Sequence, residues 1–149
     1  MKVQVQTADF DSGAVLDALT GDGSTGAVAS FIGIVRNHGD RQGVTGIELE
    51  HYPGMTEKAL RELAAAARDR FGLIDGIIIH RVGRLALGDR IVMVATAAPH
   101  RAAALEACGF LIDALKTSAP FWKREITADG ASAWVAAKET DEEATARWG

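Results

Sequence analysis

Apolar and polar residues along the chain form patterns that predict a series of strands. Alternation predicts strands with one exposed face, and a near-continuous apolar run predicts a strand buried on both faces. Asp129-Gly130 is typical of a tight turn, so a hairpin is expected near the end of the chain. The strands expected on these grounds cover residues 2–6, which we interpret as an edge strand, 27–35, 44–52, 77–82, 90–97, 121–126 and 133–138. Gly83 and Gly88 are assigned to a loop between the fourth and fifth of these strands.

Helical spacing of apolar residues predicts two long helices, over residues 56–71 and 99–116, and a short helix over residues 12–19. Gly72 ends the first long helix. Pro99 is expected at the first position of the second, where its lack of an N–H removes no helical hydrogen bond. Hairpins beside two main helices favour an α+β fold over a doubly wound parallel sheet. The residues of the second long helix expected to face inward are Leu105, Cys108, Ile112 and Leu115.

Length and composition indicate one globular domain spanning residues 1–149, with 48% apolar and 24% charged residues. A formal net charge of −4 argues against a general nucleic-acid or membrane binder. The single cysteine excludes an internal disulfide, and no Cys/His spacing indicates a metal site. The first residues are too polar for a signal peptide, and no apolar run is long enough to span a membrane, so we expect a cytoplasmic protein.

The segment from residue 115 to residue 125 places two lysines, Lys116 and Lys123, on either side of a helix stop. Pro120 ends the helix because it has no N–H and disfavours helical geometry at the residue before it. Phe121 and Trp122 are costly to expose, so they are expected to anchor the turn against the core. Two cations beside an apolar wall can bind an anion, and such a lysine can act as a base or nucleophile. The structural alternative for Lys116 is a favourable charge at a helix C-terminus.

Further cations lie at the start of the second long helix and in one loop. His100 and Arg101 follow the predicted helix start, where a positive side chain is unfavourable unless an anion binds there. The alternative is that Arg101 points to solvent or pairs with a carboxylate. Arg36, His38 and Arg41 form a basic loop after a buried strand, a common position for functional residues, although a solvated charged loop is the more frequent case.

His100 and Lys116 are sixteen residues apart, which is roughly 24 Å along a straight helix. They can serve one small ligand only if the site is long or if a second subunit brings opposite helix ends together, so this spacing favours an oligomer. Strand alternation places Lys123 and Glu125 on one face and Arg124 on the other. The residues thus predict an anion site built from Arg36, His100, Arg101, Lys116, Lys123 and Arg124.

Other reactive residues are interpreted as structural. His80 lies in an apolar strand and is typical of a core histidine whose polar atoms are satisfied. Cys108 lies on an apolar helix face, where burial is expected rather than catalysis. His51 is assigned to a strand end before the Pro53-Gly54 turn.

At this point the sequence resembles the large, catalytic subunit of molybdopterin synthase. The matching segments run in order, cover most of residues 26–138 and include two long, specific stretches. They are Gly33-Ile-Val-Arg-Asn-His38, Leu49-Glu-His-Tyr-Pro-Gly-Met-Thr-Glu-Lys-Ala59, Ile79-His-Arg-Val-Gly83, Pro99-His-Arg101 and Leu115-Lys-Thr-Ser-Ala-Pro-Phe-Trp-Lys-Arg-Glu125.

The resemblance implies a fold, a reaction and partners. The fold is α+β of the α/β-hammerhead type, with antiparallel strands, two main helices and a small extra β subdomain. Two copies form a homodimer, and two small ubiquitin-like sulfur-carrier subunits complete a heterotetramer. The carrier's C-terminal Gly-Gly thiocarboxylate delivers sulfur to cyclic pyranopterin monophosphate, forming the dithiolene of molybdopterin. No cofactor and no metal are implied, because the pterin is the substrate.

The resemblance also assigns roles to residues. Lys116 and Lys123 are expected to be catalytic. Ile34 stands where many relatives have lysine, and Lys138 where a relative has arginine, which keeps the charge but loses a bidentate fork. Two alternatives remain: a module that binds an anion or pterin without chemistry, and one that only docks the carrier. Expected to bind substrate are Arg36, His100, Arg101, Lys116, Lys123, Arg124 and Glu125, with Ile34, Val35, His38 and Lys138 as further candidates.

Overall fold

The computed structural model describes residues 1–37, 43–128, 130–131, 134 and 148. The α+β prediction is confirmed, because strands and helices alternate irregularly along the chain. The elements are β1 (Lys2–Gln6), α1 (Ser12–Ala18), β2 (Ala27–Ile34), β3 (Val44–His51), α2 (Met55–Phe71), β4 (Asp75–Arg81), β5 (Gly83–Ala86), β6 (Arg90–Ala98), α3 (Arg101–Ser118), β7 (Phe121–Thr127) and β8 (Gly130–Ala131).

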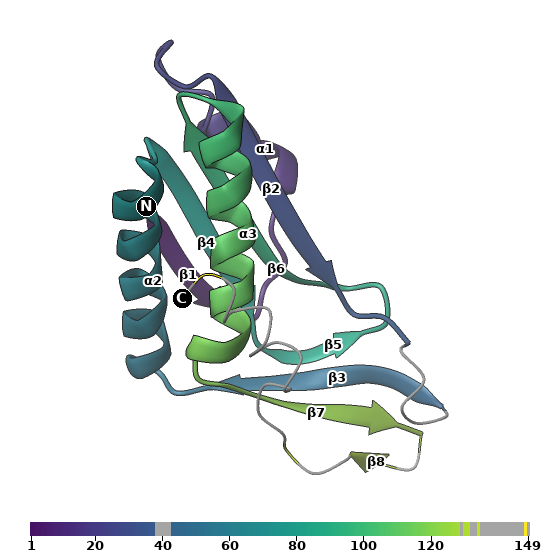
Figure 1. The fold of residues 1–149 in the computed structure, drawn as a ribbon. Helices are drawn as coiled ribbons and strands as arrows, with labels where there is room; N and C mark the ends of the chain where they lie inside the picture. The colour runs from purple at the N-terminus through teal and green to yellow at the C-terminus, as the bar shows by residue number, and fades with distance from the viewer. Residues whose placement is uncertain (38–42, 129, 132–133, 135–147, 149) are drawn as a thin grey trace.

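Two four-stranded sheets form the framework (Figure 1). The first has the order β1-β4-β6-β2, with β1 at an edge as predicted and paired parallel to β4, and the other neighbours antiparallel. The second sheet is antiparallel throughout, in the order β5-β3-β7-β8. Figure 1 shows the second sheet running across one end of the first, below the ends of α2 and α3. This smaller sheet is the extra β subdomain that was expected.

Hydrophobic residues on both faces of the first sheet hold the layers together. On one face, Ile78 and Val94 pack with Leu60 of α2 and Leu111 of α3. On the opposite face, Met93 and its neighbours pack against α1 and the residues that flank it. A third cluster joins the two sheets and is formed by Val35, Ile47, Leu49, Val82 and Leu85. The second sheet is therefore fixed to the first by an apolar core of its own.

α2 ends where the sequence indicated, whereas α3 ends at Ser118, two residues later than predicted, and both helices begin at slightly different residues. Gly72 adopts a left-handed conformation, with φ of 66°, and caps α2 as predicted. In α3, His100 is the N-cap and Arg101 is the first helical residue, so the placement of Pro99 at the first helical position is wrong. His100 has extended backbone angles, which are typical of an N-cap residue.

Three other expectations about the fold are corrected. The segment assigned to a loop around Gly83 contains β5, which pairs with β3 through backbone hydrogen bonds. Leu105 is 63% exposed, because the buried stripe of α3 runs through Ala104, Ala107 and Leu111 instead. The partner strand of β7 begins at residue 130 rather than 133, and residues 133 and 135–138 lie outside the described residues.

Candidate functional site

The turn between Lys116 and Lys123 forms around Pro120 as the sequence indicated, but Phe121 alone of the two aromatic residues packs against the core. Trp122 is 37% exposed, which corrects the expectation that both anchor the turn. Lys116 is exposed in the last turn of α3, and Ala119 after the helix has extended backbone angles. The N–H of Phe121 donates to the carbonyl of Ala119 at 2.9 Å, which closes a tight turn around Pro120. The chain then enters β7, which carries Lys123. The two lysines therefore lie on adjoining elements joined by one short turn.

The pairing of β7 with β3 determines which side chains face the core. Lys123 lies opposite Leu49, and Glu125 lies opposite Ile47. Directly opposed residues in antiparallel strands share a face of the sheet. Leu49 and Ile47 are buried in the cluster between the sheets, so Lys123 and Glu125 lie on the face of the second sheet that carries this cluster. Arg124 lies opposite Glu48, on the other face.

Arg124 has its charge engaged by Glu48. Its Nε donates to Glu48 Oε1 at 2.9 Å, and its Nη2 donates to the same oxygen. The guanidinium also lies 4.4 Å from the ring centroid of Trp134. Arg84 also approaches Glu48 Oε1, at 4.0 Å. The Glu48 carboxylate therefore pairs with two arginines, and the three residues together keep a net positive charge. Glu48 was missed from the sequence, because the cross-strand register that places it opposite Arg124 has no local signal.

His80 is a buried neighbour of the turn, as interpreted from its apolar surroundings. Its ring stacks on Phe121 with a centroid distance of 3.8 Å and an interplanar angle of 18°. Its Nδ1 lies 2.8 Å from the carbonyl of Arg81, so in the neutral ring Nδ1 carries the proton and donates it. The pKa of His80 is lowered to about 4, mainly by burial and to a smaller extent by electrostatic repulsion from Lys116 and His51, although the bond to the Arg81 carbonyl acts in the opposite direction. The ring is therefore neutral at pH 7, beside the charge of Lys116.

The other predicted cations lie elsewhere on the chain. His100 and Arg101 are exposed at the N-terminal end of α3, opposite the end that carries Lys116. Arg101 and Lys116 are separated by about 22 Å along the helix, at a rise of about 1.5 Å per residue. Within one chain the structure does not bring the two groups together. In the folded chain the two groups can therefore serve one small ligand only if the site is long or if a second subunit brings opposite helix ends together.

The residues around the end of β2 differ in accessibility. Arg36 is exposed just beyond β2. Ile34 is 53% exposed, whereas Val35 is buried in the cluster between the sheets, so of the described candidates here Ile34 and Arg36 are accessible and Val35 is not. Two of the named candidates, His38 and Lys138, lie outside the described residues.

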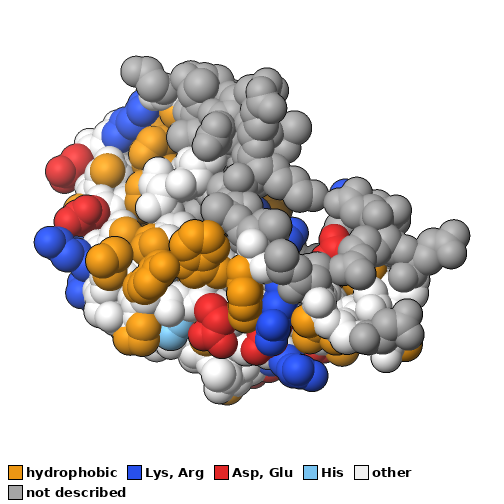
Figure 2. Space-filling model, turned by 90° about the horizontal axis from the view of Figure 1, so that it is seen from below, with side chains coloured by type: hydrophobic (Ala, Val, Ile, Leu, Met, Phe, Trp, Pro, Cys, Tyr) orange, Lys and Arg blue, Asp and Glu red, His pale blue; other side chains and the backbone are white. Residues whose placement is uncertain are grey.

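The outer face of the second sheet, which points away from the cluster between the sheets, carries charged and apolar side chains side by side (Figure 2). Tyr52 and Trp122 are exposed here and meet edge to face at 6.2 Å, with Met55 exposed at the start of α2. His51 is the last residue of β3, as assigned, and its Nε2 lies 3.8 Å from Glu57 Oε2.

Two further observations concern ligands and membranes. Within the part of the chain that the structure describes, no three His, Cys, Asp or Glu residues are grouped to hold a metal ion. Cys108 is buried, and desolvation raises the pKa of its thiol to about 11, so it remains a protonated core residue as interpreted. Among the described helices, none is long and apolar enough to cross a membrane.

Comparisons with known proteins identify the family. The family model described as MoaE protein matches residues 5–118. The molybdopterin synthase catalytic subunit of Ralstonia nicotianae is 57% identical over 99% of this chain and 84% of its own length. The solved structure of a molybdopterin biosynthesis MoaE protein from Burkholderia ambifaria is 52% identical, with a TM-score of 0.85, covering 99% of this chain and 97% of that one. A molybdopterin synthase structure from Staphylococcus aureus is 28% identical, with a TM-score of 0.80, covering 89% and 95%. The chain therefore belongs to the MoaE family, the catalytic subunits of molybdopterin synthase.

Proposed function

We propose that the chain is a cytoplasmic sulfurtransferase that moves sulfur from the C-terminal thiocarboxylate of a small ubiquitin-like carrier to cyclic pyranopterin monophosphate. The product would be the dithiolene of molybdopterin. The observation that carries the proposal is the turn between Lys116 and Lys123, which places two cationic side chains on adjoining elements. The only cysteine is buried, and this agrees with sulfur arriving on a partner.

Each lysine has surroundings that suit an anionic reactant. Lys116 lies in the last turn of α3, where the partial negative charge of the helix end attracts a cation. Lys123 lies on the same face of the second sheet as Glu125, above an apolar cluster that limits water. We assign Lys116 the principal catalytic role and Lys123 a supporting one. The two side chains would position the thiocarboxylate, transfer protons and stabilise negative charge as it develops.

The remaining cations are proposed to bind the pterin and its phosphate. Arg36, His100 and Arg101 are exposed, and the last two lie at the start of a helix, where N–H groups favour anions. Arg124 and Glu125 lie beside Lys123 on β7. Because Arg124 is already bonded to Glu48, its contribution would be mainly to the placement of the strand.

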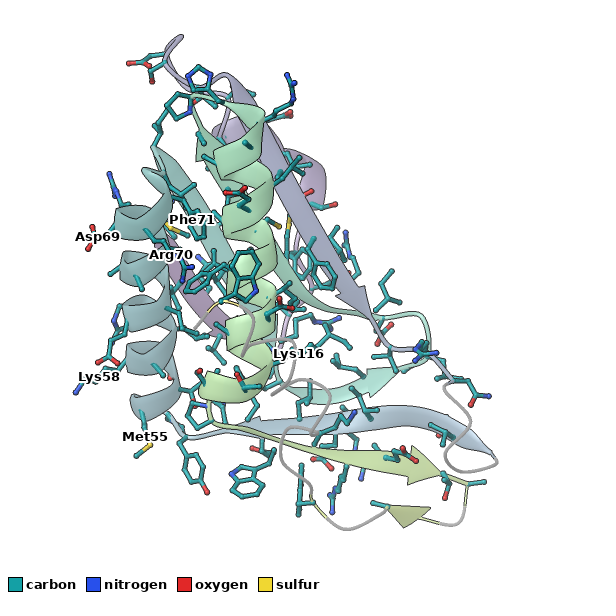
Figure 3. The ribbon with its side chains drawn as sticks, viewed as in Figure 1. Met55, Lys58, Asp69, Arg70, Phe71 and Lys116 are labelled. Atoms are coloured by element: carbon teal, nitrogen blue, oxygen red, sulfur yellow. The ribbon has the colours of Figure 1, made fainter. Side chains whose placement is uncertain are left out.

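The first experiment is reconstitution of the purified chain with a thiocarboxylated carrier and the cyclic pterin phosphate. Formation of molybdopterin is expected, and failure of the wild-type pair to form it would overturn the proposed function. In Lys116→Ala, turnover should fall by about a hundredfold or more, because a group that transfers protons or stabilises charge has been removed. The matched control is Lys58→Ala, since Lys58 is an exposed lysine on α2 that points away from α3 (Figure 3).

The same pair of variants separates the alternatives. A module that only binds an anion or pterin, or only docks the carrier, would form no product with or without Lys116. Binding of the pterin phosphate is measured by calorimetry beside turnover. Retained binding with lost turnover in Lys116→Ala supports catalysis, whereas intact turnover would remove the role assigned to Lys116.

We also propose a homodimer that carries two small subunits, forming a heterotetramer. The relatives are named catalytic subunits, and the separation of Arg101 from Lys116 favours a site completed by a second copy. Twofold symmetry would then create two equivalent sites, each with Lys116 from one copy and Arg101 from the other.

Mixing inactive chains tests this arrangement. In a random mixture of Lys116→Ala and Arg101→Ala chains, about half of the dimers would be mixed, and each would contain one intact site. Activity should therefore return to about a quarter of the wild-type value. A mixture that stays as inactive as either variant alone would show that the two residues do not serve one shared site.

A further inference from the structure

Thr56 is a buried hydroxyl that contacts the turn between Lys116 and Lys123. Its side chain is fully buried. The hydroxyl donates to the carbonyl of Pro120 at 3.0 Å and accepts from the N–H of Tyr52 at 3.0 Å. The N–H of Thr56 also donates to the carbonyl of Tyr52 at 2.9 Å. One residue therefore joins the end of β3, the start of α2 and the residue just before β7.

The segment that carries Thr56 is itself well fixed. Gly54 has a φ of 86°, a left-handed conformation that glycine adopts without strain, and its N–H donates to the Glu57 carboxylate at 3.0 Å. Figure 3 shows Met55, at the start of α2, and Lys116, near the end of α3, at the same end of the two helices and above the second sheet. A rigid start of α2 gives the Thr56 hydroxyl a defined position from which to hold the turn.

A second contact holds the next residue of the turn from another element. Phe121, which follows Pro120, stacks on His80 of β4 in the first sheet. The Pro120 carbonyl and the Phe121 ring are thus fixed by side chains from different elements. The turn cannot move as a unit without breaking one of these contacts.

We propose that Thr56 is a positioning residue, whose hydroxyl fixes the Pro120 turn and thereby sets Lys116 relative to Lys123. The inference rests on the proposed function, in which both lysines act on one substrate. Lys116 precedes the turn and Lys123 follows it, so a shift at Pro120 changes the placement of one relative to the other. A misplacement of about 1 Å can lower a catalysed rate by about a hundredfold.

The test compares two substitutions at Thr56 with one at a matched threonine. Thr56→Val keeps the shape and removes the hydroxyl, whereas Thr56→Ser keeps the hydroxyl. The control is Thr96→Val, because Thr96 is also fully buried and also donates to a carbonyl, that of Ala104 at 2.7 Å, near the other end of α3. Thr56→Val loses two buried hydrogen bonds and Thr96→Val loses one, so both should lower the melting temperature, Thr56→Val by more.

In turnover with carrier and cyclic pterin phosphate, kcat of Thr56→Val should fall at least tenfold with KM for the pterin within twofold of wild type. Thr56→Ser should restore kcat, and Thr96→Val should leave it within twofold. The inference is overturned if Thr56→Val turns over like wild type, or if both valine variants lose kcat equally. An inactive wild type would instead refute the proposed function.

A measurement on the free chain keeps the inference testable without turnover. Lysines are labelled by reductive ¹³C-methylation, and the signals of Lys116 and Lys123 are assigned with Lys116→Arg and Lys123→Arg. Thr56→Val should shift both signals, and Thr96→Val should leave them in place. Unchanged signals in Thr56→Val would show that the hydroxyl does not determine the positions of Lys116 and Lys123.

Discussion

Lowering the pH from 7 to 4 should destabilise the fold through His80. The ring is 5% exposed, stacked on Phe121 and bonded through Nδ1 to a backbone carbonyl, so a second proton would have to be placed on Nε2 in the interior. Burial is the main cause that lowers its pKa to about 4, and the charges of Lys116 and His51, which face it from α3 and β3, add to the effect. The bond to the Arg81 carbonyl raises the pKa, but its effect is smaller than that of burial.

The sign and size of the effect follow from the two pKa values. Above pH 6.5 the ring is neutral in the folded and unfolded chains, so its full contribution to stability is present. Between pH 6.5 and about 4, the unfolded chain binds a proton that the folded chain does not, and the folding equilibrium constant falls roughly tenfold per pH unit. The loss reaches about 3 kcal/mol near pH 4, which is a large share of the roughly 5–15 kcal/mol typical of a domain.

Urea unfolding at several pH values between 7 and 4 measures this loss. Carboxylates also titrate in the lower part of the range, so the informative quantity is the difference between wild type and His80→Gln, which cannot ionise. The variant is expected to be less stable at pH 7, with a shallower decline as the pH falls. His80→Phe provides a second variant that removes the ionisation and keeps an aromatic ring. Parallel curves for wild type and both variants would refute the argument.

Three further predictions concern stability and reactivity. Arg124→Ala should lower the free energy of unfolding by about 1–3 kcal/mol, because Glu48 loses two charged hydrogen bonds; an unchanged urea midpoint would contradict this. Gly26→Ala should lower the melting temperature by several degrees, because the new Cβ would lie 2.1 Å from the Pro99 carbonyl oxygen; a fold as stable as wild type would be the contrary result. The Cys108 thiol should resist disulfide reagents at pH 8 in the folded chain and react after unfolding, and rapid labelling of the native chain would count against its raised pKa.

The long amphipathic elements were predictable because their pattern is local. The apolar stripe of α2 and the left-handed Gly72 are encoded within a few turns of helix, and both appear in the structure. β5 was missed because it has only four residues and forms by pairing with β3, some 35 residues earlier in the chain. Leu105 was misplaced because an apolar residue on a helix does not have to be buried.

In the candidate site, too, features encoded by neighbouring residues were predictable from the sequence, whereas contacts between residues far apart in the chain were not. Pro120 predicts the end of α3 from the chemistry of one residue, and the turn between the lysines follows. Thr56 and Glu48 reach this region through contacts with residues 64 and 76 positions away, and no sequence pattern marks such contacts. The residues that carry charge could therefore be named from the sequence, but those that hold them in place could not.

A chain with a net charge of −4 can still hold an anion, because the charges near the turn are arranged locally. The partial negative charge at the end of α3 attracts the positive charge of Lys116. His80, which is neutral, adds no further positive charge beside Lys116. The buried, neutral imidazole thus stabilises the fold above pH 6.5 and, in the same range, adds no positive charge beside the site proposed to bind the anion.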